Sequence, residues 1–391
     1  MNKNVKKISG YDIMTLLSII IIFMPNGISA SFSLFVNVFL IIIGIILMIL
    51  YLIKFKDIFN EGIFKHILVF CVIPIVTTII NHGDYLRSFK FSYYILFCSI
   101  WSFVFFKKNY WKGIKILANL SKIFLFLNFI LSIVYPNGFY VDDVGRMYSF
   151  LNIINNMEIF WIPLSCFWLM DVIKNKKSFL LNFIIIIILI FVPSYIYQCL
   201  TGILLCAFLF LFGSISYYVR TNNKLPLSLW IIGGVMGILF FAYFGIKMFP
   251  FVNKYWTLAE RFILWENSLE MMYQRLILGY GIASNDEVVF YNQWRNYSPH
   301  NQFLILGLWG GIFNFVYFVF ILYLLIRKQY NNKSRNLKIA FVFLIVFILY
   351  YCVEITFNMG LFFVFLFSIY LFPSIEVKQN KIQNRLEMRF Q

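Results

Sequence analysis

Charged residues are scarce in this sequence. They make up 13% of its 391 residues, whereas 62% of the residues are hydrophobic. Soluble domains carry about a quarter charged residues, so this balance excludes an ordinary soluble protein. Histidine is rare as well, with three copies. We therefore expect an all-α polytopic membrane protein, with residues 1–391 forming one integral membrane domain.

The spacings that mark common metal and nucleotide sites are also missing. The six cysteines lie in or beside apolar runs without CxxC or Cys/His spacing, so neither a zinc site nor a disulfide framework is expected. Gly279-Tyr280-Gly281 is not followed by GxGxxG or Walker spacing. We expect no metal and no cofactor. The net charge of +17 would suit nucleic acid, but basic tracts beside apolar spans are more simply topology signals, and no nucleic-acid partner is expected.

Apolar stretches of the length that a membrane crossing requires recur along the whole chain. A helix needs about 20 apolar residues to cross the hydrocarbon layer. The division of 179–219 into two spans depends on Pro193, Ser194 and Gln198. We predict about twelve spans, near 12–28, 32–53, 63–80, 89–106, 116–134, 157–173, 179–196, 199–219, 227–247, 301–326, 338–355 and 359–373.

Basic residues are distributed unevenly between the predicted loops. If the N-terminus is cytoplasmic, most of the 33 basic residues fall inside, which is the usual bias. Both termini are therefore predicted to be cytoplasmic, 135–156 to be an outer loop, and 248–300 to be a large extracytoplasmic loop between spans 9 and 10. The cations left outside either anchor lipid phosphate or hold an anionic substrate. They are Arg87, Lys90, Arg146, Lys247, Lys254, Arg261, Arg275 and Arg295.

His300, at the end of the large loop, is the candidate catalytic residue. An imidazole titrates near neutrality and can accept a proton from a hydroxyl group. Ser298-Pro299 precedes it and Asn301 is a good helix cap, so His300 is predicted at a helix N-terminus, where the helix dipole favours anions. The alternative is an interfacial histidine that only caps this helix.

The same loop contains a predicted amphipathic helix near 258–272. Arg261 and Trp265 are four residues apart and therefore share a face, where a cation–π contact is possible. The alternative is an interfacial helix with no further role. Gly279-Tyr280-Gly281 is predicted to form a turn that lets backbone approach a ligand or another helix closely.

Other polar positions carry competing interpretations. Arg146 either pairs with Asp142-Asp143 or binds an anionic group. Glu158 and Glu354 lie near the outer ends of their spans, and the absence of acids at mid-membrane depth argues against an ion-coupled transporter. Gly233-xxx-Gly237 and Gly307-xxx-Gly311 are predicted to be sites of close helix packing.

The order of the motifs in the second half resembles the O-antigen polymerase and ligase superfamily of bacterial surface polysaccharide assembly. The resemblance covers roughly 195–360, whereas the first half shares only the topology and an outer-loop arginine, Arg146. Where members often carry Ser-Arg or Ser-Arg-Thr-Gly, this chain has Cys199-Leu200-Thr201-Gly202. The role of that arginine is therefore either absent or filled by another residue, with Arg275 and Arg295 as candidates. The motifs are Arg261-x-x-x-Trp265, Leu278-Gly279-Tyr280-Gly281, and His300-Asn301-x-Phe303-Leu304 followed by Gly310-Gly311.

The resemblance implies a metal-independent glycosyltransferase in the bacterial cytoplasmic membrane, with its site facing the periplasm or cell exterior. A glycan on undecaprenyl diphosphate would be the donor, and a sugar hydroxyl of another lipid-linked repeat unit the acceptor. His300 would be the base, and membrane lipids and a chain-length regulator would be partners. The expected function is an O-antigen or capsule polymerase; the alternatives are a ligase to lipid A–core, a lipid-linked oligosaccharide flippase, and an inert scaffold. The expected diphosphate- and sugar-binding residues are Arg146, Arg261, Trp265, Arg275, Tyr280, Arg295 and Asn301.

Overall fold

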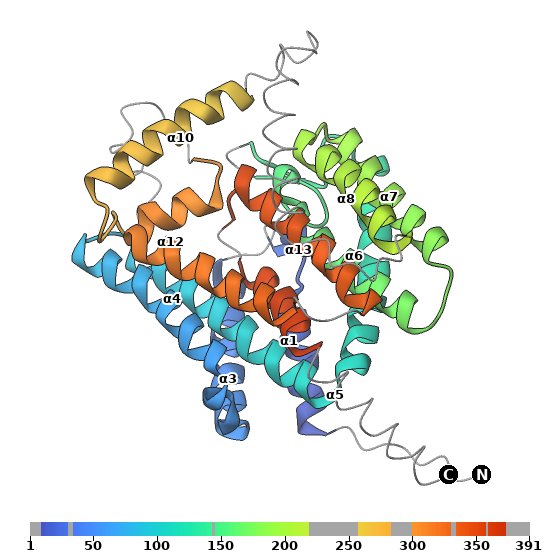
Figure 1. Cartoon of the computed structure of the whole chain (residues 1–391), viewed down its shortest axis with the longest axis horizontal. Helices are drawn as coiled ribbons and strands as arrows, with labels where there is room; N and C mark the ends of the chain where they lie inside the picture. Colours follow the sequence, from blue (N-terminus) through green and yellow to red (C-terminus); the bar gives the residue numbers. More distant parts are fainter. Residues whose placement is uncertain are drawn as a thin grey trace.

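The computed structural model describes residues 9–29, 34–142, 145–218, 257–282, 299–329, 334–356 and 359–372. This part of the chain is mostly helical (Figure 1). A helical protein with several helices able to cross a membrane is therefore confirmed. The predicted span 227–247 lies outside the described residues. By length and composition, the described helices that can cross a membrane are Gly62–Ile80, Tyr85–Val134, Phe179–Ile196, Gln302–Leu324 and Arg335–Val353.

The remaining elements are short or lie beside these helices. A two-stranded antiparallel hairpin pairs Tyr140 with Tyr148. In chain order the elements are α1 (Gly10–Ile22), α2 (Asn26–Ser29), α3 (Leu34–Lys54), η1 (Lys56–Asn60), α4 (Gly62–Ile80), α5 (Tyr85–Val134), β1 (Tyr140–Val141), β2 (Met147–Tyr148), η2 (Ile154–Asn156), α6 (Glu158–Lys174), α7 (Phe179–Ile196), α8 (Leu200–Tyr218), α10 (Thr257–Gln274), α12 (Gln302–Gln329), α13 (Arg335–Val353) and a last helix Gly360–Phe372.

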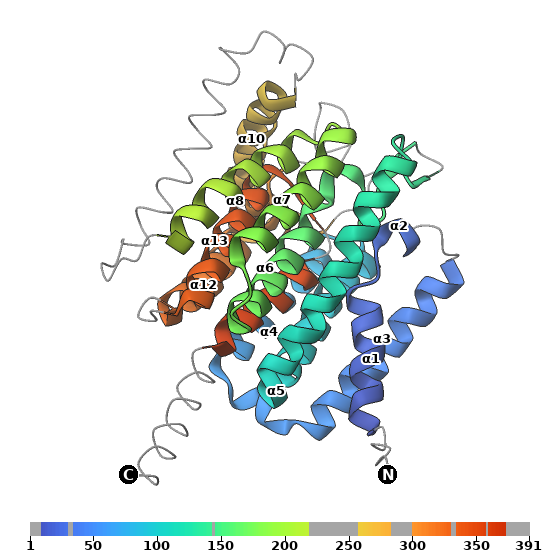
Figure 2. The same ribbon diagram turned by 90° about the vertical axis from the view of Figure 1, so that its right-hand side faces the viewer.

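Helix α6 lies at the centre of the bundle. Figure 2 shows it between α5, α7 and α13, and all its residues from Glu158 to Val172 are buried. Its sequence is apolar on every side until Asp171, which is the pattern of a helix enclosed by other helices. By contrast, α3 exposes Phe39 and Ile53 at 53% and 64%. Apolar side chains exposed in this way suit contact with lipid.

Aromatic rings fill much of the interior. Phe347 of α13 meets Phe362 of the last helix edge to face, with ring centroids 4.9 Å apart. Phe70 of α4 stacks on Phe318 of α12 at 5.7 Å. These geometries match the ring quadrupoles and add to the burial of apolar area. The high phenylalanine content of the sequence thus serves contacts between helices.

Several helix boundaries differ from the predicted spans. α1 ends at Ile22, short of the predicted 12–28, because Pro25 cannot donate the hydrogen bond that would continue the helix. The predicted spans 89–106 and 116–134 are joined in α5, which bends at Asn109 (φ −156°, ψ 86°). Two helices do occupy 179–219, and the break falls at Gln198, whose φ is 55°.

α12 is broken at Gly310-Gly311, where Gly311 has a φ of 65°. An apolar helix is found over the predicted span 301–326, and Gly307 and Gly311 do lie where other segments approach closely, but the break was not predicted. Backbone groups of 276–281 fill the break. Tyr280 N donates to Leu308 O at 2.6 Å, and Ile312 N donates to Leu276 O at 2.7 Å. The hydrogen bonds that a continuous helix would make are thus partly replaced by bonds to another segment.

The same segment also contacts α4. Ile282 N donates to Thr78 Oγ1 at 2.8 Å. Gly281 has a φ of 75°, and a Cβ there would lie 2.7 Å from Thr78 Cα. Glycine is required because both the left-handed backbone and the close approach exclude a side chain. Of the two predicted uses of Gly279-Tyr280-Gly281, the close approach to another helix is the one that the structure shows.

Candidate functional site

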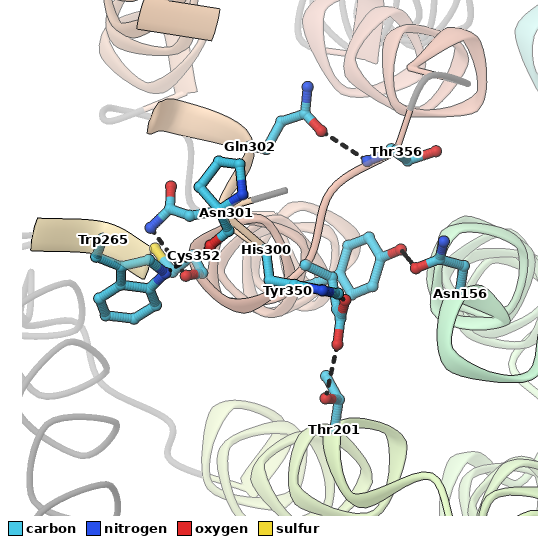
Figure 3. A network of polar contacts seen from close by, with 11 residues as sticks. Asn156, Thr201, Trp265, His300, Asn301, Gln302, Tyr350, Cys352 and Thr356 are labelled. Atoms are coloured by element: carbon cyan, nitrogen blue, oxygen red, sulfur yellow. Dashed lines mark hydrogen bonds and ion pairs between the residues drawn. The ribbon is translucent and has the colours of Figure 1, made fainter. Parts of the chain in front are cut away.

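Several helices end at one place, where their polar side chains meet (Figure 3). The N-terminal ends of α6, α8 and α12 are joined there to the residues that follow α13. The side chains that meet come from four separate regions of the sequence. We refer to Glu158, Cys199, Thr201, His300 and Glu354 as the His300 cluster.

The strongest contact in the cluster joins His300 to Glu354. The Nδ1 atom of His300 lies 3.1 Å from Oε2 of Glu354. The Glu354 side chain is 4% exposed, whereas that of His300 is 36% exposed. In the tautomer in which Nδ1 carries the proton and donates to Glu354, Nε2 keeps its lone pair. The pair is thus arranged as a base with an orienting carboxylate, accessible from one side.

The backbone around His300 is held separately from its ring. Asn301 caps α12, because its Oδ1 accepts hydrogen bonds from Phe303 N at 3.0 Å and Leu304 N at 3.1 Å. Its Nδ2 donates to the carbonyl of Cys352 at 3.0 Å. His300 itself has a φ of 45°. Left-handed backbone is uncommon outside glycine and often occurs at functional sites.

The cluster contains two buried carboxyl groups, those of Glu158 and Glu354. Oε1 of Glu158 accepts from Cys199 Sγ at 3.2 Å, and Oε1 of Glu354 accepts from Thr201 Oγ1 at 3.3 Å. Glu158 is fully buried, and its Oε2 has no hydrogen-bond partner among the described residues. The converging helix N-termini favour negative charge at this place. Glu158 and Glu354 were noted in the sequence only for their place near span ends.

Trp265 connects α10 to this cluster. Its Nε1 donates to the carbonyl of Pro299, the residue before His300, at 2.8 Å. The helix itself covers the range predicted from the sequence, 258–272, with one or two further residues at each end. Figure 1 shows α10 at the edge of the molecule, next to α12. A hydrogen bond therefore links α10 to the backbone next to His300.

Arg275 and Tyr280 lie near the C-terminal end of α10, on the side of α4. Arg275 Nη1 donates to Asn81 Oδ1 at 2.8 Å, and the guanidinium carbon lies 4.7 Å from the Tyr280 ring centroid. No hydrogen bond or ion pair among the described residues joins Arg275 to Thr201. Thr201 bonds to the acid Glu354 instead.

Arg146 lies in the β1–β2 hairpin and pairs with Asp142. Its Nε atom is 2.7 Å from Asp142 Oδ2, and this carboxylate raises the pKa of Arg146. Of the two interpretations of Arg146, the ion pair is the one present in the structure. No described contact connects Arg146 to the His300 cluster. The side chain of Arg261 and the whole of Asp143 and Arg295 lie outside the described part of the chain.

Within the described ranges, no three His, Cys, Asp or Glu side chains are grouped as the ligands of a metal ion would be. A comparison with models of known protein families gives no match, and neither does a comparison with curated proteins.

Proposed function

We propose that the protein is a membrane glycosyltransferase that polymerises bacterial surface polysaccharide of the O-antigen or capsule type. It transfers a glycan from undecaprenyl diphosphate to a sugar hydroxyl of a second lipid-linked repeat unit. The His300–Glu354 pair is the observation that carries this proposal. The order of the motifs around His300 provides the second line of support.

The proposed reaction needs one base and one leaving group. Nε2 of His300 removes the proton of the acceptor hydroxyl while its oxygen attacks the anomeric carbon of the donor. The bond between this carbon and the diphosphate oxygen breaks, and undecaprenyl diphosphate leaves with the electron pair. Glu354 stabilises the imidazolium that forms and keeps the ring in place, as carboxylates do in catalytic triads.

Neutralisation of the diphosphate is assigned to cations of the large loop. Arg261 lies one turn before Trp265 on α10, and Trp265 is bonded to Pro299. A guanidinium group binds phosphate through two parallel hydrogen bonds. The N-terminus of α12 adds a favourable dipole beside His300. Arg275 and Arg295 are further candidates from the same loop, and Arg146 is the candidate from the 135–156 loop.

The proposal includes a topology of twelve spans, with both termini cytoplasmic and the loops 135–156 and 248–300 outside. The contacts at one end of the bundle support it. Asn26, after α1, bonds to Asn152 in one of these loops, and Tyr350 near the end of α13 bonds to Asn156. The C-terminal ends of α1 and α13 therefore lie on the side of the 135–156 loop, as alternating spans require.

Replacement of His300 by alanine in the native strain tests the function. We expect single repeats in place of long polysaccharide when the surface glycans are separated on a gel. His66→Ala is the control, because His66 packs against the rings of Tyr317 and Phe320. Unchanged polymer in the His300 variant would contradict the proposal. Long polymer retained on undecaprenyl diphosphate would identify a ligase, and repeats retained on the cytoplasmic face a flippase.

A further inference from the structure

A cavity of about 600 Å³ lies apart from the His300 cluster. Its walls come from the end of α1, from α2, from α3, from the first turns of α5 and from residues 148–153. None of the five cluster residues lines it. Its volume falls within the range of pockets that bind small molecules, about 300–1,000 Å³.

One wall of the cavity is cationic. Arg87 and Lys90 both line it, and they lie three residues apart on α5, so they share a face of this helix. Lys90 is exposed and forms no ion pair among the described residues. The nearest acid on the same element is Asp84, whose Oδ1 accepts from the backbone N of Arg87 at 2.9 Å. Two cations on one wall suit a phosphate group.

Amides and aromatic rings line the cavity as well. Asn26 Nδ2 donates to Asn152 Oδ1 at 2.8 Å, and Asn152 Nδ2 donates to Asn156 O at 2.8 Å. These bonds fix the two amides before any ligand arrives. Tyr94 and Tyr148 also line the cavity. Oriented amides and aromatic rings suit the hydroxyl groups and the apolar faces of a sugar.

A third part of the lining is apolar. Leu40 and Ile41 face the cavity from α3, a helix whose outer side chains are exposed. A long hydrocarbon chain can lie against such a surface and continue into the bilayer. Cationic, amide and apolar groups thus line the same cavity.

We propose that this cavity binds a lipid whose sugar headgroup is attached through phosphate. Arg87 and Lys90 hold the phosphate, Asn26 and Asn152 the sugar, and Leu40 the start of the hydrocarbon tail. Asn156 also accepts a hydrogen bond from Tyr350, four residues before Glu354. Residues 148–156 therefore separate the cavity from the His300 cluster. The further assignment of the cavity to the acceptor repeat unit rests on the proposed function.

A cysteine placed in the wall gives a local measurement of occupancy. Leu40→Cys in the full chain, in phosphatidylcholine nanodiscs, is treated with a maleimide in the presence of N-acetylglucosaminyl undecaprenyl diphosphate. Native cysteines give little background, because five are buried and Cys352 is half-buried. We expect labelling to slow about tenfold at a probe concentration about ten times the Kd. Labelling of Lys115→Cys, exposed elsewhere on α5, is expected to stay unchanged.

Removal of the cations tests the assignment of residues. Adding Arg87→Gln and Lys90→Gln to Leu40→Cys is expected to weaken binding about tenfold and to reduce the protection to about twofold. Lys90→Gln alone is the milder variant if the double variant does not fold, and it is also expected to reduce protection. Full protection in these variants would overturn the proposal.

Two further measurements identify the ligand and separate this cavity from the proposed reaction. Phosphatidylglycerol, which has the phosphate but no sugar, is expected to give no protection at the same concentration; equal protection would overturn the proposal. His300→Ala is expected to leave protection of Leu40→Cys intact. If His300→Ala leaves polymer synthesis unchanged, the proposed function fails, but the cavity can still bind the lipid. If Leu40→Cys is not protected in a chain that still makes polymer, the site alone is rejected.

Discussion

At the scale of single residues, His300 is fixed twice, by its ring and by its backbone. Glu354 holds the imidazole, while the cap at Asn301 holds the turn in which His300 has a positive φ. Neither constraint depends on the other. A substitution at Glu354 can therefore be used to change the chemistry of the ring without removing the turn.

Glu354→Gln is expected to lower kcat about 100-fold, because the amide retains a hydrogen bond to His300 but does not stabilise an imidazolium. Since Glu354 acts through His300, KM for the lipid-linked substrates is expected to stay unchanged, as is the thermal midpoint in detergent. Polymer synthesis from purified lipid-linked repeats measures both constants. Glu266→Gln, on an exposed position of α10, is the control. A change in KM alone would show that Glu354 binds substrate instead.

The sequence indicated some of these residues and not others. His300, Asn301 and Trp265 stand out because a polar loop next to an apolar span limits where they can lie. Glu158 and Glu354 are nearly two hundred residues apart. The sequence of an apolar span does not indicate which other spans end beside it. For Arg146, the sequence did not decide between an ion pair and an anion site. The ion pair forms because the hairpin brings the side chain of Arg146 to Asp142.

At the scale of elements, α10 is attached to its neighbours at its middle and through the segment that follows it. Trp265 is bonded to Pro299, and residues 276–281 are bonded to the break of α12. Gly307 of α12 also lies against Met272. The first part of α12, which positions His300, is therefore packed as one unit with α10.

Gly311→Ala is expected to weaken this unit. Gly311 has a φ of 65°, and a Cβ there would collide with the Ile277 carbonyl, so we expect a loss of about 1–3 kcal/mol. Thermal unfolding in detergent measures the loss. Gly10→Ala is the control, because nothing lies within 4 Å of a Cβ at Gly10. Equal midpoints for the two variants would show that α12 does not need its left-handed residue.

A helix could be predicted where its own sequence has an amphipathic period. The helix near 258–272 has its own apolar period, and α10 is found there. The break in α12 could not be predicted, because Gly310-Gly311 inside an apolar run also fits close packing of a continuous helix. The backbone of 276–281 decides between a broken and a continuous helix. Nearly every residue type has the same backbone groups, so this contact cannot be predicted from the sequence.

At the scale of the whole molecule, the uneven distribution of charge predicts which loops face outward. Asn137, after α5, and Lys177, before α7, are both exposed and lie at opposite ends of α6. In intact cells, a membrane-impermeant maleimide is expected to label Asn137→Cys and not Lys177→Cys. Permeabilised cells are the control, where both are expected to react. The reverse pattern would invert the proposed topology, and with it the side on which His300 acts.

Long apolar helices could be predicted from composition because a bilayer imposes a length and an apolar surface on each helix that crosses it. The arrangement of the helices could not be predicted from composition. The rings of Phe70, Phe318 and Phe347 pack by shape, and many other pairings would bury them equally well.

The break in α12 also bears on the order of synthesis. Its carbonyls at Leu308 and Trp309 and its amide at Ile312 take their partners from residues 276–281, which the ribosome makes first. The broken helix therefore emerges when the groups that complete it are already available. Partners encoded after α12 would leave these groups unsatisfied in hydrocarbon during insertion, at several kcal/mol each. Moving the segment behind α12 in a permuted chain would thus penalise insertion even if the final contacts were identical.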